Sequence, residues 1–305
     1  MLKITSPFLN LIPAQTRLFL VKNIKNKGIQ TLFDPNSIRN YAKIKKSKNL
    51  TVVEITNGVK LKVDLNDIIG FRSALNGKWD DTAINILKKF NAKKTTFIDI
   101  GANIGTTCLP AASFGYKVIA YEANPLMTSY LLQNISLNPN LKIITFPFAL
   151  GNMNNKTVEI FENIGNQGSS SIIKDWSPGK QSKIKYKTHI TTLDESLRNL
   201  NLQKNENLII KLDVEGYELE VIKGARNTIK EYKPIILFEN NPVSPYSVKA
   251  IRKKLQNYNF FAVTENLVFT HADLNRRYEN VFAIHNSQAH LASKKFLFNF
   301  TQKPN

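Results

Sequence analysis

The chain has 305 residues, 42% of them hydrophobic, which is enough for one large domain or two small ones with a substantial core. No run of eighteen apolar residues occurs and the only cysteine is Cys108, so the composition excludes an ordinary membrane-spanning helix and an internal disulfide, and it favours a cytoplasmic location. The net charge of +19 would suit a polyanionic partner such as nucleic acid, but residues 91–245 carry only +3 of it, and no aromatic-interleaved basic motif is present.

The first 63 residues are predicted to form a basic extension. Proline and arginine interrupt its apolar beginning, so we expect no signal peptide there, and we expect this stretch to pack on the rest of the protein rather than on a membrane. The segment 42–49 is typical of a solvated linker. The residues "LTVVEITNGVKLKVDLND" then alternate between apolar and polar around Asn57 and Gly58, which predicts a β-hairpin.

Helices and strands are expected to alternate after this hairpin. The segment "WDDTAINILKKF" has apolar residues at helical spacing, with Asp80 or Asp81 as an acidic start. From residue 95 the expected strands are "TFIDI", "KVIAYE", "KIITFPFAL", "NLIIKLDV" and "KPIILFE", and the expected helices are 104–113, 125–137, 217–230 and 246–257. Strands that alternate with helices and are apolar on both faces predict an α/β fold with a mostly parallel sheet, covered by helices on both sides.

Two regions depart from this alternation. Residues 151–192 are richer in Gly, Ser and Asn, so we expect a β-rich insertion, in which "NQGSSSI" either presents hydroxyls to a ligand or is an ordinary polar loop. Near the end, "NFFAVTENLVFT" and "ENVFAIHN" are predicted to be two more strands, the last without a helix after it. We therefore predict three parts: the extension over 1–63, a main domain over 64–290 and a tail over 291–305.

The turn within "TFIDIGANIGTTCLPAASFG" carries an acid and two glycines four residues apart. Asp99, Gly101 and Gly105 would lie at the carboxyl end of the first parallel strand, where ligands bind in open α/β sheets. The glycines allow a tight turn and the close approach of a ligand. Asp99 would repel a phosphate, so it favours a cationic or hydroxylated ligand. The alternative is an ordinary strand-turn-helix junction without a ligand.

The next strand ends in Glu122, 21 residues after Gly101, at the position that accepts hydrogen bonds from the two hydroxyls of a ribose. The turn has the pattern D-x-G-x-x-x-G and not the dinucleotide fingerprint G-x-G-x-x-G, so a pyrophosphate cradle is missing and a dehydrogenase is the weaker hypothesis. A ligand with a ribose, no phosphate and a positively charged amino acid part fits better. S-adenosylmethionine is such a ligand, and we predict it as the cofactor.

A second group of charged residues follows the strand "NLIIKLDV". Lys211 and Asp213 are two residues apart and so point to one side, and Glu215 follows in the turn. Charged groups here are costly to bury without partners, so we predict that all three are catalytic. The alternative is a structural ion pair or a helix cap. For Glu218 and Glu220 we expect a solvated helix face.

The following strand ends in Glu239, Asn240 and Asn241 and is expected to lie beside the strand that precedes Asp213. Carboxylates and an amide there could bind Mg²⁺, but no further acid or histidine motif completes a ligand shell. We therefore favour a metal-free site in which Asp213 or Glu239 is the general base. The four histidines lie apart, without the paired spacing of a metal site, and no G-x-S-x-G motif of a hydrolase is present.

The sequence resembles the FkbM-type S-adenosylmethionine-dependent methyltransferases over roughly residues 64–285. The pieces that carry the resemblance are "FIDIGANIGTTCLPAA", "VIAYEANP", "FALGN", "TLDESL", "LIIKLDVEGYELEVIKGA" and "PIILFEN", of which "KLDVEGYE" is the most specific. The resemblance implies the class I methyltransferase fold. In this fold a seven-stranded, Rossmann-like, mostly parallel sheet has helices on both faces and an antiparallel last strand.

The resemblance also implies roles for individual residues. Residues 211–216 would face the methyl group and its acceptor. The reaction implied is O-methylation of a hydroxyl group on a sugar, a glycan or a related metabolite. The cofactor would be held by Asp99, Gly101, Ala102, Asn103, Gly105, Glu122, Ala123, Asn124, Ala149 and Leu150.

Two other functions stay open from the sequence. The basic flanks would dock RNA or DNA in a nucleic-acid methyltransferase, but "LDVEGY" stands where an N-P-P-Y-type tetrapeptide would follow the fourth strand. The other alternative is a catalytically silent binding protein on the same fold. The intact turn and the second charged group argue against this alternative. The acceptor would be selected by variable loops, here 151–192 and the N-terminal segment.

Overall fold

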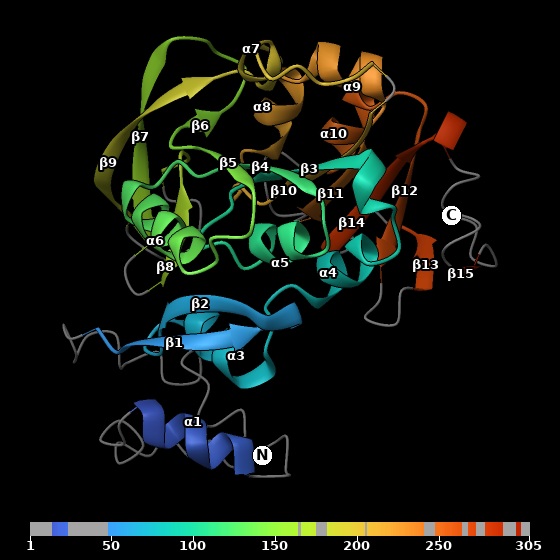
Figure 1. The fold of residues 1–305 in the computed structure, drawn as a ribbon. Coiled ribbons are helices and arrows are strands. Elements are labelled where there is room, and N and C mark those ends of the chain that lie inside the picture. Colours follow the sequence, from blue (N-terminus) through green and yellow to red (C-terminus); the bar gives the residue numbers. More distant parts are fainter. Residues whose placement is uncertain are drawn as a thin grey trace, which may run out of the picture.

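A nine-stranded sheet forms the centre of the described part of the chain (Figure 1). This computed structural model describes residues 14–23, 48–163, 166–174, 182–204, 206–240, 248–263, 268–272, 278–288 and 297–299. Predictions that fall elsewhere, such as the linker over 42–47 and a role for Asn241, lie outside these residues.

The order of the strands confirms the predicted fold class. Across the sheet the order is β5 (Ile143–Phe146), β4 (Lys117–Tyr121), β3 (Thr95–Ile100), β10 (Asn207–Leu212), β11 (Ile235–Asn240), β14 (Tyr278–His285), β12 (Tyr258–Val263), β13 (Val268–His271) and β15 (Leu297–Asn299). From β5 to β11 all neighbours are parallel, whereas β14 is antiparallel to both β11 and β12. The first seven strands are thus the predicted sheet with its antiparallel last strand, and β13 and β15 extend its edge.

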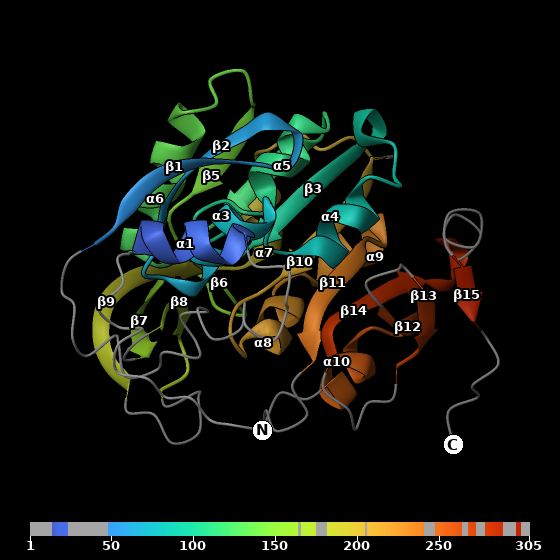
Figure 2. The ribbon, with the colours of Figure 1, turned by 90° about the horizontal axis from the view of Figure 1, so that it is seen from below.

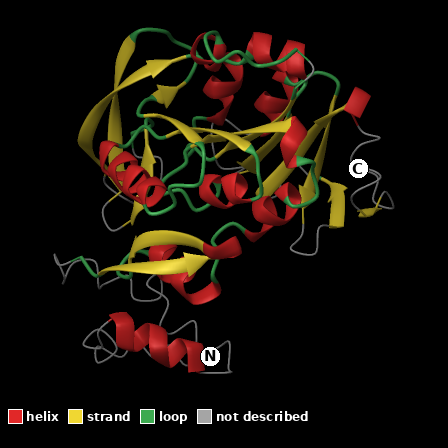
Figure 3. Cartoon of the chain, in the orientation of Figure 1, coloured by secondary structure: helices red, strands yellow, loops and turns green. Residues whose placement is uncertain are grey.

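Helices cover both faces of this sheet (Figures 1 and 3). One face carries α4 (Asp81–Leu87), α5 (Cys108–Ser113) and α6 (Pro125–Ser136), and the other carries α7 (Leu193–Leu197), α8 (Glu218–Lys223), α9 (Arg226–Tyr232) and α10 (Val248–Lys254). Each face of the sheet has its own hydrophobic core. Successive residues of a strand pack alternately in these two cores, Phe97 in that of the first face and Ile98 in that of the second. Because side chains alternate along a strand, strands covered on both faces need apolar residues throughout, which explains the uninterrupted apolar runs of the sequence.

The predicted hairpin is confirmed. Strand β1 (Leu50–Ile55) pairs antiparallel with β2 (Val59–Asp64), and Asn57 and Gly58 both have positive φ, 60° and 74°, as the tight Asn-Gly turn requires. The hairpin, the following α3 (Ile68–Asn76) and Leu18 of α1 (Ala14–Asn23) share the core of the first face. Figure 2, seen from below, shows these N-terminal elements lying across that side of the molecule. The sequence analysis missed α3, although Asp67 caps it by accepting hydrogen bonds from the backbone N–H groups at 69 and 70.

A buried asparagine ties the hairpin to the glycine turn after β3. Asn134 of α6 is fully buried, and its Oδ1 accepts a hydrogen bond from the backbone N–H of Lys62 at 2.6 Å. Its Nδ2 donates to the backbone oxygens of Ile104 at 2.8 Å and Lys62 at 3.3 Å. Replacing Asn134 with alanine leaves these backbone groups unpaired, so we expect the free energy of unfolding, measured by urea denaturation, to fall by about 2–4 kcal/mol.

The matched control is Asn138, two residues beyond the end of α6. Asn138 makes the equivalent pair of hydrogen bonds with the backbone of Lys60, at 2.9 and 2.7 Å, but in an exposed position. Water can replace the lost side chain there, so the Asn138→Ala variant is expected to lose less than about 1 kcal/mol. Equal losses in the two variants would contradict the role given to Asn134.

Four predicted elements differ from the structure in extent. The strand expected over 142–150 is two strands in different sheets, β5 and β6 (Ala149–Leu150). The helix expected over 104–113 begins only at Cys108, because Gly105 has a φ of 96°, outside the helical range. The helix expected over 217–230 is two helices, α8 and α9, which meet at Gly224, where a Cβ would lie 1.8 Å from the carbonyl oxygen of Gly151. The segment "NFFAVTENLVFT" forms two strands, β12 and β13, that pair antiparallel. Short 3-10 helices occupy Ala92–Lys94 and Asn286–Gln288.

The region 151–192 forms the β-rich insertion that its sequence predicts. Strands β7 (Lys156–Asn163), β8 (Asn166–Ser171) and β9 (Ser182–Thr191) make an antiparallel sheet, and β9 also pairs with β6 (Ala149–Leu150). At the end of β8, Ser171 Oγ donates to the backbone oxygen of Glu215 at 2.8 Å, and Ser170 Oγ accepts from Asn124 Nδ2 at 3.0 Å. The insertion is therefore tied to the turns after two strands of the central sheet.

Candidate functional site

A cavity of about 460 Å³ lies at the carboxyl ends of β3, β4, β10 and β11. Its walls come from the turns after these strands, from the segment between α3 and α4, from the end of β8 and from β14. Asp99 and Gly105 are buried and do not line it. The other twelve residues singled out from the sequence all line this one cavity: Gly101, Ala102, Asn103, Glu122, Ala123, Asn124, Ala149, Leu150, Lys211, Asp213, Glu215 and Glu239.

The glycine turn after β3 lies against the end of β10. Gly101 has a φ of 86°, and a Cβ there would lie 2.0 Å from the carbonyl oxygen of Asp213, so only glycine fits. Asn103 also takes the left-handed conformation, with a φ of 51°, and its Oδ1 accepts a hydrogen bond from the backbone N–H of Ile104 at 2.8 Å. These contacts place the turn directly beside the second charged group, on the neighbouring strand.

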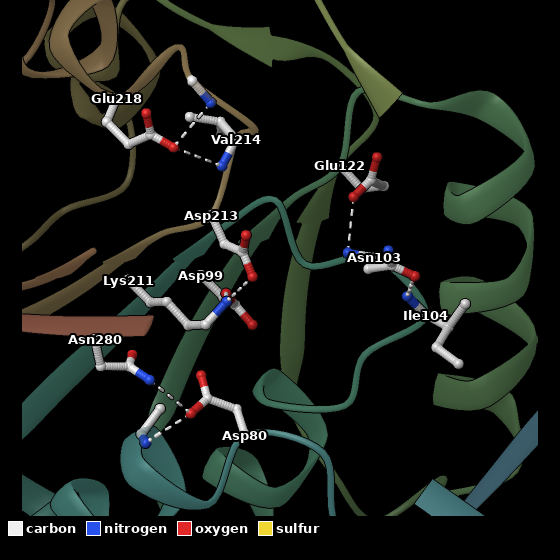
Figure 4. Close-up of polar contacts among 12 residues, drawn as sticks. Asp80, Asp99, Asn103, Ile104, Glu122, Lys211, Asp213, Val214, Glu218 and Asn280 are labelled. Atoms are coloured by element: carbon white, nitrogen blue, oxygen red, sulfur yellow. Dashed lines mark hydrogen bonds and ion pairs between the residues drawn. The ribbon is translucent and has the colours of Figure 1, made fainter. Parts of the chain in front are cut away.

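Glu122 holds the other side of the same turn (Figure 4). Its Oε2 accepts a hydrogen bond from the backbone N–H of Asn103 at 2.7 Å, and its Oε1 accepts one from the backbone N–H of Asn124 at 2.8 Å. Burial raises the pKa of Glu122 to about 7, although these two hydrogen bonds oppose the rise. Each carboxylate oxygen has a second lone pair, so Glu122 can accept two further hydrogen bonds from a ligand in the cavity.

Asp99 is a buried carboxylate whose oxygens have no hydrogen-bond partner among the described residues. It is 1% exposed, and Lys211 Nζ lies 4.0 Å from its Oδ1. Burial raises the pKa of Asp99 to about 6; Lys211 opposes this rise, and Asp213 and Asp80 reinforce it. Lys211 is thus an ion-pair partner of Asp99 at a long distance, and no hydrogen bond from a described residue offsets the burial of the carboxylate. Its charge therefore favours a ligand that brings positive charge to the adjoining turn.

Lys211 is the cation within a group of carboxylates (Figure 4). Its side chain is 8% exposed, and its Nζ donates to Asp213 Oδ2 at 2.8 Å. Burial by itself lowers the pKa of Lys211, but Asp213, Asp99 and Asp80 together raise it above its ordinary value. Lys211 therefore stays protonated and acts as a fixed positive charge, not as a general base. Its partner Asp213 is half-buried and lines the cavity.

The turn after β10 is held by Glu218. Its Oε1 accepts hydrogen bonds from the backbone N–H groups of Val214 at 3.4 Å and Gly216 at 3.2 Å, and burial raises the pKa of Glu218 to about 7. The prediction of a solvated helix face for Glu218 and Glu220 is wrong, because they are only 6% and 8% exposed. Glu218 folds back onto the turn, and Glu220 pairs with Lys223 at 2.6 Å.

Among the residues of the cavity wall that the sequence analysis missed are Trp79, Asp80 as a site residue, and Asn280. Asp80 caps the N-terminus of α4, and it is one of the two residues predicted to start this helix. Its Oδ1 accepts hydrogen bonds from the backbone N–H of Ala83 at 2.9 Å and from Asn280 Nδ2 at 3.4 Å. Burial raises the pKa of Asp80, and Lys211 opposes this rise. The only signal in the sequence was the cap pattern, which indicates a helix start and not a site.

The described residues contain neither a cluster of metal ligands nor a membrane-spanning helix. Among them, no group of three or more His, Cys, Asp and Glu side chains is arranged to hold a metal ion. None of the helices that the structure describes combines the length and the hydropathy needed to cross a bilayer. The cytoplasmic location and the metal-free site stay predictions.

A sequence model of the family described as Methyltransferase FkbM domain matches residues 99–262, more than half of the chain. Among solved structures, the chain is similar to methyltransferase FkbM from Methylobacillus flagellatus KT, with 15% identity, a TM-score of 0.43 and coverage of 88% of this chain and 58% of that chain. It is also similar to tRNA (uracil-54, C5)-methyltransferase from Pyrococcus abyssi, solved with S-adenosyl-L-homocysteine, with 12% identity, a TM-score of 0.41 and coverage of 78% and 45%.

A third similar structure is magnesium protoporphyrin IX methyltransferase from Synechocystis PCC 6803, with 11% identity, a TM-score of 0.38 and coverage of 67% of this chain and 77% of that chain. The chain spans about half the length of the first two structures. No curated protein matches it.

Proposed function

The chain belongs to the FkbM methyltransferase family, and from this premise we propose that it transfers a methyl group from S-adenosylmethionine to a hydroxyl group of a sugar, a glycan or a related metabolite. The observation that carries the proposal is the pair of buried carboxylates, Asp99 and Glu122, on the two sides of the glycine turn. Among the described residues, no hydrogen bond reaches the oxygens of Asp99, and each oxygen of Glu122 accepts one. A ligand with a positively charged end and a ribose suits this pair of carboxylates.

The residues predicted from the sequence keep their roles in this proposal. Gly101, Ala102 and Asn103 of the turn line the cavity and would contact the amino acid part of the cofactor. Asp99 and Gly105 are buried behind the lining and would act from there, Gly105 by shaping the turn and Asp99 by its charge. Glu122 would accept hydrogen bonds from the ribose hydroxyls. Ala123, Asn124, Ala149 and Leu150 would lie beside the adenine, together with Phe148, which also lines the cavity. Support comes from their shared position at the carboxyl edge of the sheet, where this class of fold binds its ligands.

The second charged group would act on the acceptor. When bound, S-adenosylmethionine supplies an electrophilic methyl group. Asp213 takes the proton of the attacking hydroxyl, because it is half-buried, lines the cavity and lies against Gly101 of the cofactor turn. Lys211 Nζ holds the Asp213 carboxylate at 2.8 Å and so fixes its position beside the acceptor. Alignment of the two reactants in the cavity supplies the rest of the rate enhancement.

Glu239 is the alternative base, and Glu215 is the third predicted catalytic acid. Both line the same cavity as Asp213. Glu215 has its backbone oxygen bound by Ser171 Oγ at 2.8 Å, which fixes the turn that carries it. In this proposal Glu215 and Glu239 bind acceptor hydroxyls, and Mg²⁺ is not required.

Cofactor affinity is expected to depend on pH near neutrality. Because the pKa of Glu122 is raised to about 7, the carboxylate is mostly protonated at pH 6 and mostly ionised at pH 8. The ionised form accepts the ribose hydrogen bonds and attracts a cation, so affinity for S-adenosylmethionine should fall about tenfold between pH 8 and pH 6. Isothermal titration calorimetry at both pH values tests this, and it should show proton release on binding near pH 7.

The Glu122→Gln variant is the control for this dependence. It removes the titrating group, so its weaker affinity should change little between pH 6 and pH 8. A wild-type affinity that is constant over this range, or one that rises toward pH 6, would contradict the role of an ionised Glu122.

Methyl transfer to a hydroxyl can be tested with S-adenosylmethionine labelled in its methyl group. The protein is incubated with neutral oligosaccharides and, separately, with RNA, and mass spectrometry locates the added methyl group. The proposal expects label on a sugar oxygen and none on RNA. Label on a nucleobase would overturn it in favour of the nucleic-acid alternative.

A further inference from the structure

We infer that Ser171, at the end of β8, is a positioning residue of the proposed reaction. Its hydroxyl holds the acceptor turn, residues 213–216 after β10, in the backbone conformation that places Asp213 and Glu215 in the cavity. The inference rests on the proposed function and deepens it, because it gives the β-rich insertion a part in the methyl-transfer step. Ser171, Asp213 and Glu215 all line the cavity.

The acceptor turn has a backbone conformation that few side chains tolerate. Glu215 has a φ of 50° and Gly216 a φ of 96°, so two successive residues have positive φ. Glycine adopts this region freely, whereas in other residues it brings the Cβ close to the following carbonyl oxygen. Glu215 therefore needs contacts that hold it in place, and residues held in this way cluster at functional sites.

Hydrogen bonds from two different elements hold the acceptor turn. Glu218 of α8 accepts hydrogen bonds from the backbone N–H groups of Val214 at 3.4 Å and Gly216 at 3.2 Å (Figure 4). Ser171 Oγ donates to the backbone oxygen of Glu215 at 2.8 Å, from a position 44 residues earlier in the chain. The bond from Ser171 is the shortest of the three. The insertion thus supplies the contact that acts directly on the left-handed residue.

The hydroxyl of Ser171 is oriented for this contact. Ser171 is 4% exposed, and the pairing of β8 with β7 places it opposite Phe161. Its Oγ accepts a hydrogen bond from the backbone N–H of Ile173 at 3.0 Å, so its single proton is left to be donated to Glu215. Alanine at position 171 would remove this donor and add no bulk.

The residue before Ser171 is tied to the cofactor side of the cavity. Ser170 Oγ accepts a hydrogen bond from Asn124 Nδ2 at 3.0 Å, and the backbone N–H of Asn124 donates to Glu122 at 2.8 Å. Two successive residues of β8 therefore contact the turn that would hold the cofactor and the turn that would hold the acceptor. A misplacement of about 1 Å between reactants can cost about a hundredfold in rate, so a contact that fixes the spacing of these two turns affects turnover.

Amide hydrogen exchange, followed by NMR on the full chain, tests the contact without any substrate. In the Ser171→Ala variant the amides of Val214 and Gly216 should exchange about tenfold faster than in the wild type, which corresponds to about 1.4 kcal/mol of local opening. The amides of β3, in the interior of the sheet, should exchange at the wild-type rate.

The neighbouring serine is the matched control. Ser170→Ala removes a hydroxyl from the same end of β8, but the contact of this hydroxyl with Asn124 lies on the cofactor side. Exchange of the Val214 and Gly216 amides should therefore stay within about twofold of the wild type in this variant.

A second background tests the conformation of Glu215 itself. Asparagine tolerates the left-handed region better than glutamate does, so a Glu215→Asn protein depends less on the hold of Ser171. In that background the Ser171→Ala change should accelerate exchange of the Val214 and Gly216 amides less than about threefold. A contact that only packs the insertion would have the same effect in both backgrounds.

Turnover connects the acceptor turn to methyl transfer. With methyl-labelled S-adenosylmethionine and neutral oligosaccharides, Ser171→Ala should lower the initial rate by about 10–100-fold, while the dissociation constant of S-adenosylhomocysteine changes less than about threefold. The control is Ser136, whose Oγ donates to the backbone oxygen of Gln133 at 2.7 Å on the exposed end of α6. Ser136→Ala should keep the wild-type rate.

Each outcome decides the matter. Wild-type exchange or wild-type turnover in Ser171→Ala overturns the inference, as does equal acceleration of exchange in Ser170→Ala or in the Glu215→Asn background. A Ser171→Ala chain that does not fold, or that exchanges faster throughout β3, also overturns it, because the effect would then be one of global stability. If the wild type transfers no methyl group to any sugar, the proposed function fails instead, and the exchange series still decides whether Ser171 holds the turn.

Discussion

Replacing Glu122 with alanine is expected to weaken the binding of S-adenosylhomocysteine by at least about a hundredfold, or about 2.7 kcal/mol. Two losses combine in this variant. The ribose hydroxyls lose a charged acceptor, and the backbone N–H groups of Asn103 and Asn124, now bound at 2.7 and 2.8 Å, lose their partner. The turn that forms one wall of the site would then relax together with the contact to the ligand. Isothermal titration calorimetry measures the change in affinity.

A control variant separates this effect from a general loss of stability. Glu195 is an acid on α7 that pairs with Arg198 at 2.9 Å and is not part of the cavity lining. Glu195→Ala should leave the affinity for S-adenosylhomocysteine within about twofold of wild type, because the exposed pair contributes little. If the Glu122→Ala variant bound S-adenosylhomocysteine as tightly as the Glu195→Ala variant, the ribose could not lie against Glu122.

Replacing Asp213 with asparagine is expected to reduce turnover by about 10²–10⁴-fold, the range for loss of a general base. The amide has nearly the same shape and can still accept the hydrogen bond from Lys211 Nζ, but it cannot take up the proton of the acceptor hydroxyl. Affinity for S-adenosylhomocysteine should change less than about threefold, because Asp99 and Glu122 are untouched. Initial rates with labelled S-adenosylmethionine and an accepted sugar give the turnover.

Glu239→Gln is the matched comparison for Asp213→Asn. It removes one carboxylate from the same cavity and is expected to reduce turnover less than about tenfold, through weaker binding of the acceptor. The reverse result, with the large loss in Glu239→Gln and a small one in Asp213→Asn, would transfer the role of base to Glu239. Thermal unfolding of both variants shows whether the Lys211 environment has stayed folded.

The cofactor side of the site could be predicted because local sequence determines it. Asp99 and Glu122 each come at or just after the end of a short apolar strand, and the carboxyl ends of parallel strands meet at one edge. Gly101 was recognisable for the same reason, since a tight turn follows a strand directly. Its contact with the carbonyl oxygen of Asp213 could not be predicted, because it depends on the pairing of β3 with β10.

The acceptor side could not be predicted because tertiary packing creates it. Asp80 and Trp79 lie far from Lys211 in the sequence and reach the cavity only because α4 packs on the first face of the sheet. Asn280 enters from β14, whose antiparallel direction brings its first residues to the edge where the parallel strands end. No local sequence pattern predicts that these residues lie together in the fold.

Glu218 shows a different limit of pattern reasoning. Helical periodicity indicates which face of α8 a residue occupies, and by that measure Glu218 was expected in solvent. The side chain is long enough to fold back over the first turn of the helix and bind the backbone N–H groups of Val214 and Gly216. Asn134 shows the same limit. Nothing in the sequence of α6 indicates that its side-chain amide makes hydrogen bonds with both the hairpin and the glycine turn.

Calorimetric titration of the full chain with S-adenosylmethionine, S-adenosylhomocysteine and NAD tests the central claim most directly, with Asp99→Ala measured alongside. We predict micromolar binding of the first two ligands, loss of both in the variant and no binding of NAD, because the turn has a buried acid to which no described residue donates a hydrogen bond and lacks the third glycine of a pyrophosphate cradle. Binding of NAD in preference to S-adenosylhomocysteine, or binding that survives Asp99→Ala unchanged, would contradict the account of this site.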